Sequence, residues 1–335
     1  MCGILGIIQN NNKIYRSLFE KMLLEIRHRG PESEGVWFND QENVAFGHRR
    51  LAIIDLSAGG RQPMVSVDGR YVIIFNGEIY NYKELKEELE KEKYVFKTQS
   101  DTEVLLCAYI KWGPESLQKL NGMFSFAIWD NKEQKLFAAR DRLGEKPFKY
   151  YVDENRFIFA SEIKAILADR SIGRKVDWQA VDTALSFRFV GAPETGFLGI
   201  KKLPAGHYLI WQNNSVLIKQ YWDVGEIQET YNGSVAELKK EAWSLFVDSV
   251  KKRMTADVPI GAFLSGGLDS TSVIAATKEL GARNVATFVI SMGGKSEDQK
   301  YAALAAKYFT TNHHEIEINN INYQEALQKL VWHYD

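Results

Sequence analysis

The chain begins MCGILGIIQ (residues 1–9), with a cysteine directly after the initiator methionine and then a run of small and β-branched apolar residues. A short apolar run that ends at polar residues is typical of a buried β-strand. Similar runs occur at residues 43–54, 70–80, 123–130, 135–141, 146–152 and 156–163, and helical periodicity occurs at residues 14–28, 82–92 and 101–112. Many strands with few helices predict an α+β domain of two antiparallel sheets with helices outside them.

After residue 235 the pattern changes to helices that alternate with strands. Helices are predicted at residues 235–253, 269–280 and 298–309, and strands at residues 259–264, 285–291 and 313–318. This alternation predicts parallel βαβ units. We therefore expect domains at residues 1–225 and 235–335, joined by the polar segment 221–235. Three strands are fewer than the roughly five or six of a typical sheet, so we expect the second domain to be incomplete in this sequence.

The composition excludes several classes of protein. Lys and Arg number 42 and Asp and Glu 43, so a net charge of -1 gives no general attraction for nucleic acid or an anionic membrane. The sequence has no apolar run of membrane-spanning length and no secretory signal. Cys2 and Cys107 match neither a disulfide framework nor a zinc site. These features are expected of a cytoplasmic protein, with Cys107 as an inert, buried helix residue.

Cys2 combines two reactive groups once Met1 is removed. A free α-amine titrates near 7.7–8.0, so about one molecule in seven carries it neutral at pH 7. Such an amine can accept the thiol proton, so one residue supplies both nucleophile and base. Gly3 would leave room for a substrate carbonyl. The alternative is a small apolar residue at the start of a strand.

Other polar residues follow the predicted strands. In FNGEIYN (residues 75–81), an Asn76–Gly77 turn offers a side-chain amide and an unhindered backbone N–H, which together suit an oxyanion hole. The alternative is an ordinary hairpin turn. Ser100 and Glu103 have capping-box spacing, so Asp101 either favours a helix N-terminus or binds an ammonium group. Arginines near residues 27–29 and 49–50 suit either a carboxylate ligand or the surface.

In combination these motifs resemble a known family. Their order and spacing resemble those of class II glutamine amidotransferase domains, above all those of glutamine-hydrolysing asparagine synthetases. The segments that carry the resemblance are MCGILGI, RHRGPE, GHRRLAIIDLS, QPM, FNGEIYNY, SDTEVLL, GMFSFAIWD, ARDRLGEKPFKYY and FASEIKAIL. The resemblance implies an N-terminal-nucleophile hydrolase sandwich, two antiparallel sheets between helices. It also implies that Cys2 attacks the glutamine side chain while its α-amine moves the proton.

The same resemblance implies roles for the residues around Cys2. Asn76 and Gly77 would form the oxyanion hole, and Arg50 would hold the glutamine carboxylate. Glu78 and Asp101 would bind the ammonium group. The remaining pocket wall would be Leu51, Ala52, Ile53 and Ile54. Arg49 is left unassigned.

A glycine-rich loop follows the first strand of the second domain, in PIGAFLSGGLDSTSV (residues 259–273). Loop N–H groups and a helix N-terminus suit a phosphate, but the P-loop lysine motif is absent. The loop resembles the pyrophosphate loop of the ATP-pyrophosphatase superfamily, which implies an α/β parallel-sheet domain that binds ATP and Mg²⁺. The residues implied in ATP binding are Leu264, Ser265, Gly266, Gly267, Asp269, Ser270 and Ile290, with Asp269 also a metal ligand.

The two halves together imply a carbon–nitrogen ligase that uses glutamine, aspartate and ATP to make asparagine, glutamate, AMP and pyrophosphate. An apolar passage would carry the ammonia, because water would hydrolyse the adenylate. Three alternatives stay open: amidation of a sugar acid or peptide carboxylate, phosphoribosyl-pyrophosphate or sugar amidotransfer, and a binding module without catalysis. A second acidic loop expected in the family is not found before Asp335, and Glu297 and Asp298 stay unassigned. A homodimer is left open.

Overall fold

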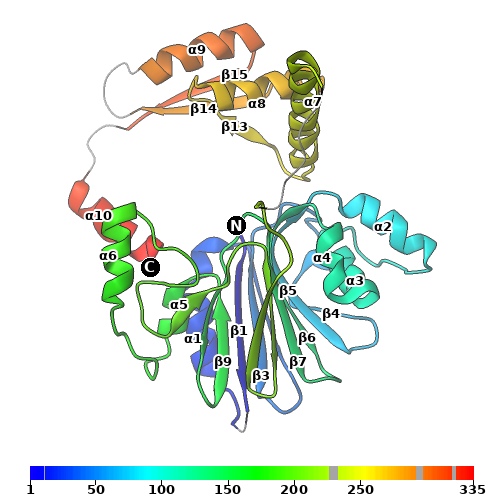
Figure 1. The fold of residues 1–335 in the computed structure, drawn as a ribbon, viewed down its shortest axis with the longest axis vertical. Coiled ribbons are helices and arrows are strands. Elements are labelled where there is room, and N and C mark those ends of the chain that lie inside the picture. Colours follow the sequence, from blue (N-terminus) through cyan, green and yellow to red (C-terminus); the bar gives the residue numbers. More distant parts are fainter. Residues whose placement is uncertain (11, 226–232, 292–296, 319–321) are drawn as a thin grey trace. The chain divides into compact units, whose positions relative to one another are not determined.

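Two six-stranded antiparallel sheets form the first part of the computed structural model, which describes residues 1–10, 12–225, 233–291, 297–318 and 322–335 (Figure 1). The first sheet has the order β10 (Ile200–Lys202), β8 (Lys149–Val152), β9 (Arg156–Ala160), β1 (Gly3–Gln9), β3 (Val44–Arg50) and β2 (Ser33–Phe38). The second has the order β12 (Ser215–Gln220), β11 (His207–Gln212), β7 (Lys135–Arg140), β6 (Gly122–Asp130), β5 (Tyr71–Ile79) and β4 (Met64–Val65). The predicted pair of antiparallel sheets is confirmed.

The opening strand β1 explains why its sequence is apolar without interruption. Ile4 and Ile8 lie in the core between the two sheets, whereas Leu5 and Ile7 face the opposite side of the same sheet. Successive side chains of a strand point to opposite faces, so a strand that is covered on both faces needs apolar residues at every position. β1 lies between β3 and β9 and is therefore a central strand of the first sheet.

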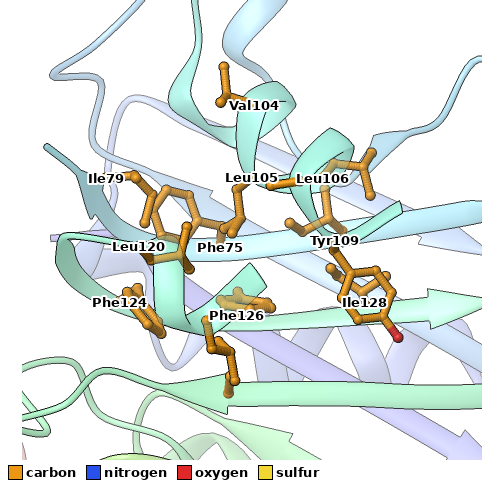
Figure 2. Close-up of a cluster of buried hydrophobic side chains, with 14 of the residues drawn as sticks. Phe75, Ile79, Val104, Leu105, Leu106, Tyr109, Leu120, Phe124, Phe126 and Ile128 are labelled. Atoms are coloured by element: carbon orange, nitrogen blue, oxygen red, sulfur yellow. The ribbon is translucent and has the colours of Figure 1, made fainter. Parts of the chain in front are cut away.

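Helices cover the outer face of each sheet. α1 (Arg16–Leu24) and α5 (Ile163–Leu167) pack in the apolar cluster of the first sheet. α2 (Tyr82–Lys91), α3 (Asp101–Trp112) and α4 (Ser116–Lys119) pack against the second sheet. Figure 2 shows Leu105, Leu106 and Tyr109 of α3 above the aromatic side chains of the sheet. α6 (Trp178–Phe187) follows later in the chain.

The second unit is a small parallel sheet with helices. The chain has two compact units, Met1–Glu226 and Ile227–Asp335. The second unit contains β13 (Gly261–Phe263), β14 (Ala286–Ser291) and β15 (Asn312–Glu317), paired in parallel in this order, as predicted. Its helices are α7 (Val235–Arg253), α8 (Leu268–Glu279), α9 (Glu297–Phe309) and α10 (Tyr323–Tyr334). The predicted linker lies partly outside the described residues, at 226–232.

Three local predictions were wrong. Asn76 and Gly77 form no turn, because they continue β5 and pair with Ser125 and Phe124 of β6. Ser100 does cap α3, but it accepts from the Thr102 N–H, and the Glu103 carboxylate binds the backbone N–H groups of residues 97 and 98, so no capping box forms. Cys107 is only half-buried. Among the described helices, none combines the length and apolar character needed to span a bilayer.

Candidate functional site

A pocket of about 150 Å³ opens where β1, β3 and β5 meet the start of α3. Its size suits a molecule smaller than the drug-sized ligands that fill cavities of about 300–1,000 Å³. Nine of the residues predicted for the glutamine site line it: Cys2, Arg50, Leu51, Ile53, Ile54, Asn76, Gly77, Glu78 and Asp101. Ala52 does not line the pocket, and its N–H donates to the Glu32 carboxylate at 2.7 Å.

The backbone and side chain of Cys2 are both held in place. The Arg29 guanidinium donates to the Cys2 carbonyl oxygen at 2.9 Å and to the Glu162 carboxylate at 2.8 Å. The cations Arg29 and Lys164 hold the pKa of Glu162 down to about 2, against the effect of burial. The Cys2 Sγ atom lies 3.4 Å from the Leu51 N atom and 3.6 Å from the Leu51 O atom. Burial raises the pKa of the Cys2 thiol, so a nearby base is needed to form the thiolate.

Asn76 and Gly77 present two donors to the pocket. Among the described residues the Asn76 Nδ2 atom is buried without a hydrogen-bond partner, and the residue is only 1% exposed. The Phe75 and Ile79 N–H groups are bound by Gln62 Oε1 at 2.6 Å and by Asp101 Oδ2 at 3.0 Å. Alternate N–H groups of a strand point to the same edge, so the Gly77 N–H faces the pocket between them.

Gly77 also has no room for a side chain. A Cβ atom at this position would lie 2.1 Å from the Met123 carbonyl oxygen. Any other residue would therefore force β5 away from β6 and move the Asn76 donor with it. The close strand approach accounts for glycine here, although its backbone is ordinary strand.

The backbone of Phe75 is fixed from both sides, next to Asn76. Gln62 accepts from its N–H, and His48 Nε2 lies 3.0 Å from its carbonyl oxygen. Burial lowers the pKa of His48 to about 4, so the ring is neutral at pH 7 and carries its proton on Nε2, facing the carbonyl. The Gln62 amide also donates to the Thr102 hydroxyl at 3.1 Å. Gln62 thus joins β5 to the start of α3.

Charged groups line the far side of the pocket. Arg50 donates to the carbonyl oxygens of Ile54, Asp55 and Ser57, which leaves two of its five N–H groups without a partner among the described residues. Burial raises the pKa of Asp101 to about 7 and that of Glu78 above its ordinary value. A substrate cation beside Asp101 would restore its ionised form.

The glycine loop of the second unit has the form expected of a phosphate site. Gly266 has φ of +76°, and a Cβ atom there would lie 2.5 Å from the Ala302 N atom, so the loop requires glycine. The N-cap Gly267 offers no side-chain oxygen to the first N–H groups of α8. Ser265 and Ser270 hydroxyls lie 3.1 Å apart across the loop. The exposed Asp269 stands in the first turn of the helix.

The two residues predicted beside the adenosine differ in accessibility. Leu264 is fully buried in the core of the second unit, so only its backbone is available to a ligand. Ile290, near the end of β14, is 48% exposed. Glu297 and Asp298 lie in the first turn of α9.

Sequence reasoning missed several pocket residues, namely Gly60, Gln62, Phe75, Ser100, Thr102, Met123 and Lys146. Gln62 and Lys146 stand in QPM and ARDRLGEKPFKYY, two motifs that supported the resemblance without being given a role. Thr102 and Met123 stand in SDTEVLL and GMFSFAIWD, which supported the resemblance in the same way, but their place in the pocket depends on how α3 and β6 pack beside β5.

Comparison with known proteins follows the same division of the chain. A family model described as a glutamine amidotransferase domain matches residues 1–222, and one described as asparagine synthase matches residues 241–335. The chain is 38% identical to a Methanocaldococcus jannaschii protein named as a glutamine-hydrolysing asparagine synthetase, with 100% of this chain and 68% of that protein covered. It is 41% and 38% identical to two Bacillus subtilis proteins of that name.

The match to the Bacillus subtilis proteins covers 82% and 100% of this chain, and 45% and 53% of their own lengths. The chain thus spans about half to two thirds of these relatives.

Two solved structures share the fold. The glutamine phosphoribosylpyrophosphate amidotransferase from B. subtilis aligns with a TM-score of 0.50 at 18% identity, over 97% of this chain and 70% of that one. An allosteric regulatory enzyme of purine biosynthesis aligns with a TM-score of 0.52 at 16% identity, over 94% of this chain and 80% of that one. These identities support likeness of fold alone. By its family matches and its curated relatives, the chain belongs to the glutamine-hydrolysing asparagine synthetase family, with its glutamine amidotransferase domain at residues 1–222.

Proposed function

We propose that residues 1–225 hydrolyse glutamine at Cys2 and that residues 235–335 belong to a site that activates aspartate with ATP. Ammonia from the first site would convert the β-aspartyl-adenylate to asparagine, with release of glutamate, AMP and pyrophosphate. The names of the curated relatives, at 38–41% identity for the first three, support this reaction over amidation of another carboxylate.

The buried, unpartnered Asn76 amide carries the glutaminase proposal. Leaving a buried donor unpaired costs about 1–3 kcal/mol, so its place beside the Cys2 thiol is explained by a ligand oxygen. In the proposed reaction the thiol gives its proton to the α-amine, and Sγ bonds to the amide carbon of glutamine. The oxygen becomes an oxyanion held by Asn76 Nδ2 and the Gly77 N–H.

The amide bond then breaks, the amine returns the proton to the leaving ammonia, and water hydrolyses the thioester. Arg50 would hold the substrate carboxylate with its remaining N–H groups. Asp101 and Glu78 would hold the ammonium group. Arg50 and Asp101, both buried, thus each gain a partner of opposite sign when glutamine binds.

The glycine loop supports ATP binding in the second unit. Its uncapped helix N-terminus and small residues suit a pyrophosphate, which would satisfy the first N–H groups of α8. The proposed contacts are Ser265, Gly266, Gly267 and Ser270, with Leu264 and Ile290 beside the adenosine. Within the described residues no three His, Cys, Asp or Glu side chains gather into a metal site, so Asp269 would hold Mg²⁺ together with phosphate oxygens.

The test uses the purified chain after mass analysis has shown loss of Met1. Glutamine is supplied first, and ATP, Mg²⁺, aspartate and ammonia are supplied in a separate reaction. We expect glutamate from the first reaction and no asparagine from the second, because the described second unit has a sheet of three strands, fewer than the roughly five or six of a typical sheet. An active chain that retains Met1 would overturn the role of the α-amine. Equal amounts of AMP and asparagine would show that residues 235–335 suffice for synthesis.

A further inference from the structure

The turn between β7 and β8 is held by two charged residues. Asp141 is 1% exposed, and its carboxylate accepts from four backbone N–H groups, one of them that of Lys146 at 2.9 Å. The Arg140 guanidinium donates to the carbonyl oxygens of Gly144 at 2.6 Å and Lys146 at 2.8 Å. Both backbone polar groups of Lys146 are therefore fixed, which fixes the direction in which its side chain leaves the turn.

The side chain of Lys146 ends in the glutamine pocket. The residue is 5% exposed and lines the same cavity as Cys2 and Glu78. Its Nζ atom lies 3.3 Å from the Met1 Sδ atom, and no ion pair of Lys146 occurs within the described residues. A thioether is a weak acceptor and compensates little for the lost hydration of an ammonium group. Such a costly placement calls for an electrostatic role in the pocket.

We propose that Lys146 is a positioning residue whose ammonium group keeps the Cys2 α-amine unprotonated once Met1 has been removed. The inference rests on the proposed glutaminase function of this site. Lys146 contacts the side chain of Met1 and lines the same cavity as Cys2, so after removal of Met1 the ammonium group and the new N-terminus share one pocket. Two cations close together in a poorly hydrated pocket disfavour each other. Burial lowers the pKa of Lys146, whereas the carboxylates of Glu78, Glu145 and Asp141 act to raise it. An ordinary lysine holds its proton much more strongly than an ordinary α-amine, so the amine loses its proton first.

The charges around the N-terminus act in both directions, and Lys146 is one of those that lower the pKa of the amine. Arg29, from the 3-10 turn Arg27–Arg29, is paired with Glu162. The other charged groups that face the pocket or act on the Met1 amine are Glu32, Arg50, Glu78, Asp101 and Lys146. Burial chiefly lowers the pKa of the Met1 amine, and Arg29 and Lys146 lower it further, whereas the Cys2 thiol and Glu32 act in the opposite direction. Lys146 exchanges no proton with the substrate in this scheme.

The direct test is a titration of the α-amine by NMR, on chain labelled with ¹⁵N cysteine. Lys146→Met removes the charge with similar side-chain length, Lys146→Arg keeps it, and the exposed Lys132→Met is the control for a distant charge. Loss of Met1 from every variant is confirmed by mass. We expect the amine pKa of Lys146→Met to rise by about one unit, with Lys146→Arg and Lys132→Met close to the parent. An unchanged midpoint in Lys146→Met would overturn the proposal.

Kinetics give an independent reading in the same variants. In Lys146→Met, the acidic limb of the pH profile of kcat/KM for glutamine hydrolysis should move to higher pH. At pH values below the limb, kcat/KM should be about tenfold lower than in the parent, whereas the plateau at alkaline pH should be unchanged. A uniform loss at every pH, without movement of the limb, would show a structural role and overturn the proposal. If the parent chain hydrolyses no glutamine, the proposed function fails, whereas the NMR titration still decides the role of Lys146.

Discussion

The two candidate sites differ in how completely the protein forms them without a ligand. In the first unit the side chains of Arg50, Asn76 and Asp101 are buried, and backbone groups of neighbouring residues hold Arg50 and Asp101. In the second unit Ser265, Gly267 and Asp269 are exposed, and what the loop offers is mainly backbone N–H groups. Acyl transfer needs donors that are already aimed at the developing oxyanion, whereas a flexible pyrophosphate can satisfy an exposed helix N-terminus by itself. The difference suggests that each site is organised to the degree its chemistry demands.

The largest effect should come from the nucleophile. Cys2→Ala is expected to reduce glutamate formation to the uncatalysed background, because no other described group in the pocket carries a thiol. Cys107→Ala is the matched control, since these are the two cysteines of the chain, and it should retain full activity. ATP binding by the second unit should not change in either variant. Appreciable glutaminase activity of folded Cys2→Ala would contradict the assignment.

The next effect concerns the charges proposed to hold glutamine. Arg50→Leu and Asp101→Asn should each raise the KM for glutamine more than tenfold, because each leaves a substrate charge buried without a partner, at a cost of about 2–5 kcal/mol. The exposed Arg61→Leu serves as control. Steady-state kinetics measure the effect. Parent-like KM values would return Arg50 and Asp101 to structural roles in the loop and at the helix start.

The two units should also differ in local stability. Large clusters of apolar residues cover both faces of the central strands of the first unit, whereas the second-unit core has five buried members, namely Leu264, Ile274, Val289, Ala302 and Ala306, in the described residues. Amide hydrogen exchange of the intact chain should therefore be at least about tenfold faster in β13–β15 than in β1, β5 and β6. Equal protection in the two sheets would show that the second unit is stabilised by something other than this core.

The smallest effect concerns Asp101 and pH. Burial raises its pKa to about 7 in the folded chain, from an ordinary value of 3.8, so ionisation of Asp101 lowers folding stability as pH rises between these values. Asp101→Asn removes this contribution. The variant should match the parent near pH 4 and exceed its stability at pH 8 by about 1 kcal/mol or more, which thermal unfolding at the two pH values can measure. If Asp101→Asn were more stable than the parent only at acidic pH, the predicted direction of the Asp101 pKa shift would be wrong.

Local patterns predicted the elements well where one rule dominated. The apolar runs located β1, β5, β6, β7 and β9, and the alternation after residue 235 located β13–β15 with their helices. Short edge strands such as β4 and β10 were missed, because two or three residues carry little periodicity. Asn76–Gly77 was predicted to turn because the pair favours hairpins, but pairing with β6 along the whole of β5 outweighs that local preference.

The pocket itself was predictable only in part. Cys2 and Asp101 carry a local signal, a reactive N-terminus and a carboxylate at a helix start. Gln62 and Lys146 act through contacts that join distant parts of the chain, Phe75 with Thr102 in one case and the β7–β8 turn with Met1 in the other. The spacing of residues along the sequence cannot predict these contacts of Gln62 and Lys146, because they depend on how the two sheets are stacked.

The hydrogen bond from His48 to Phe75 crosses between the two sheets, and it lies beside the proposed reaction centre, whose residues are divided between them. Cys2 precedes β1 of one sheet, and Asn76 belongs to β5 of the other. The distance between the Cys2 thiol and the Asn76 amide therefore changes when one sheet slides sideways over the other. A displacement of about 1 Å would be enough to slow turnover severely. The glutaminase rate should accordingly respond to hydrostatic pressure even when glutamine binding does not, with His48 as the residue that resists the shear.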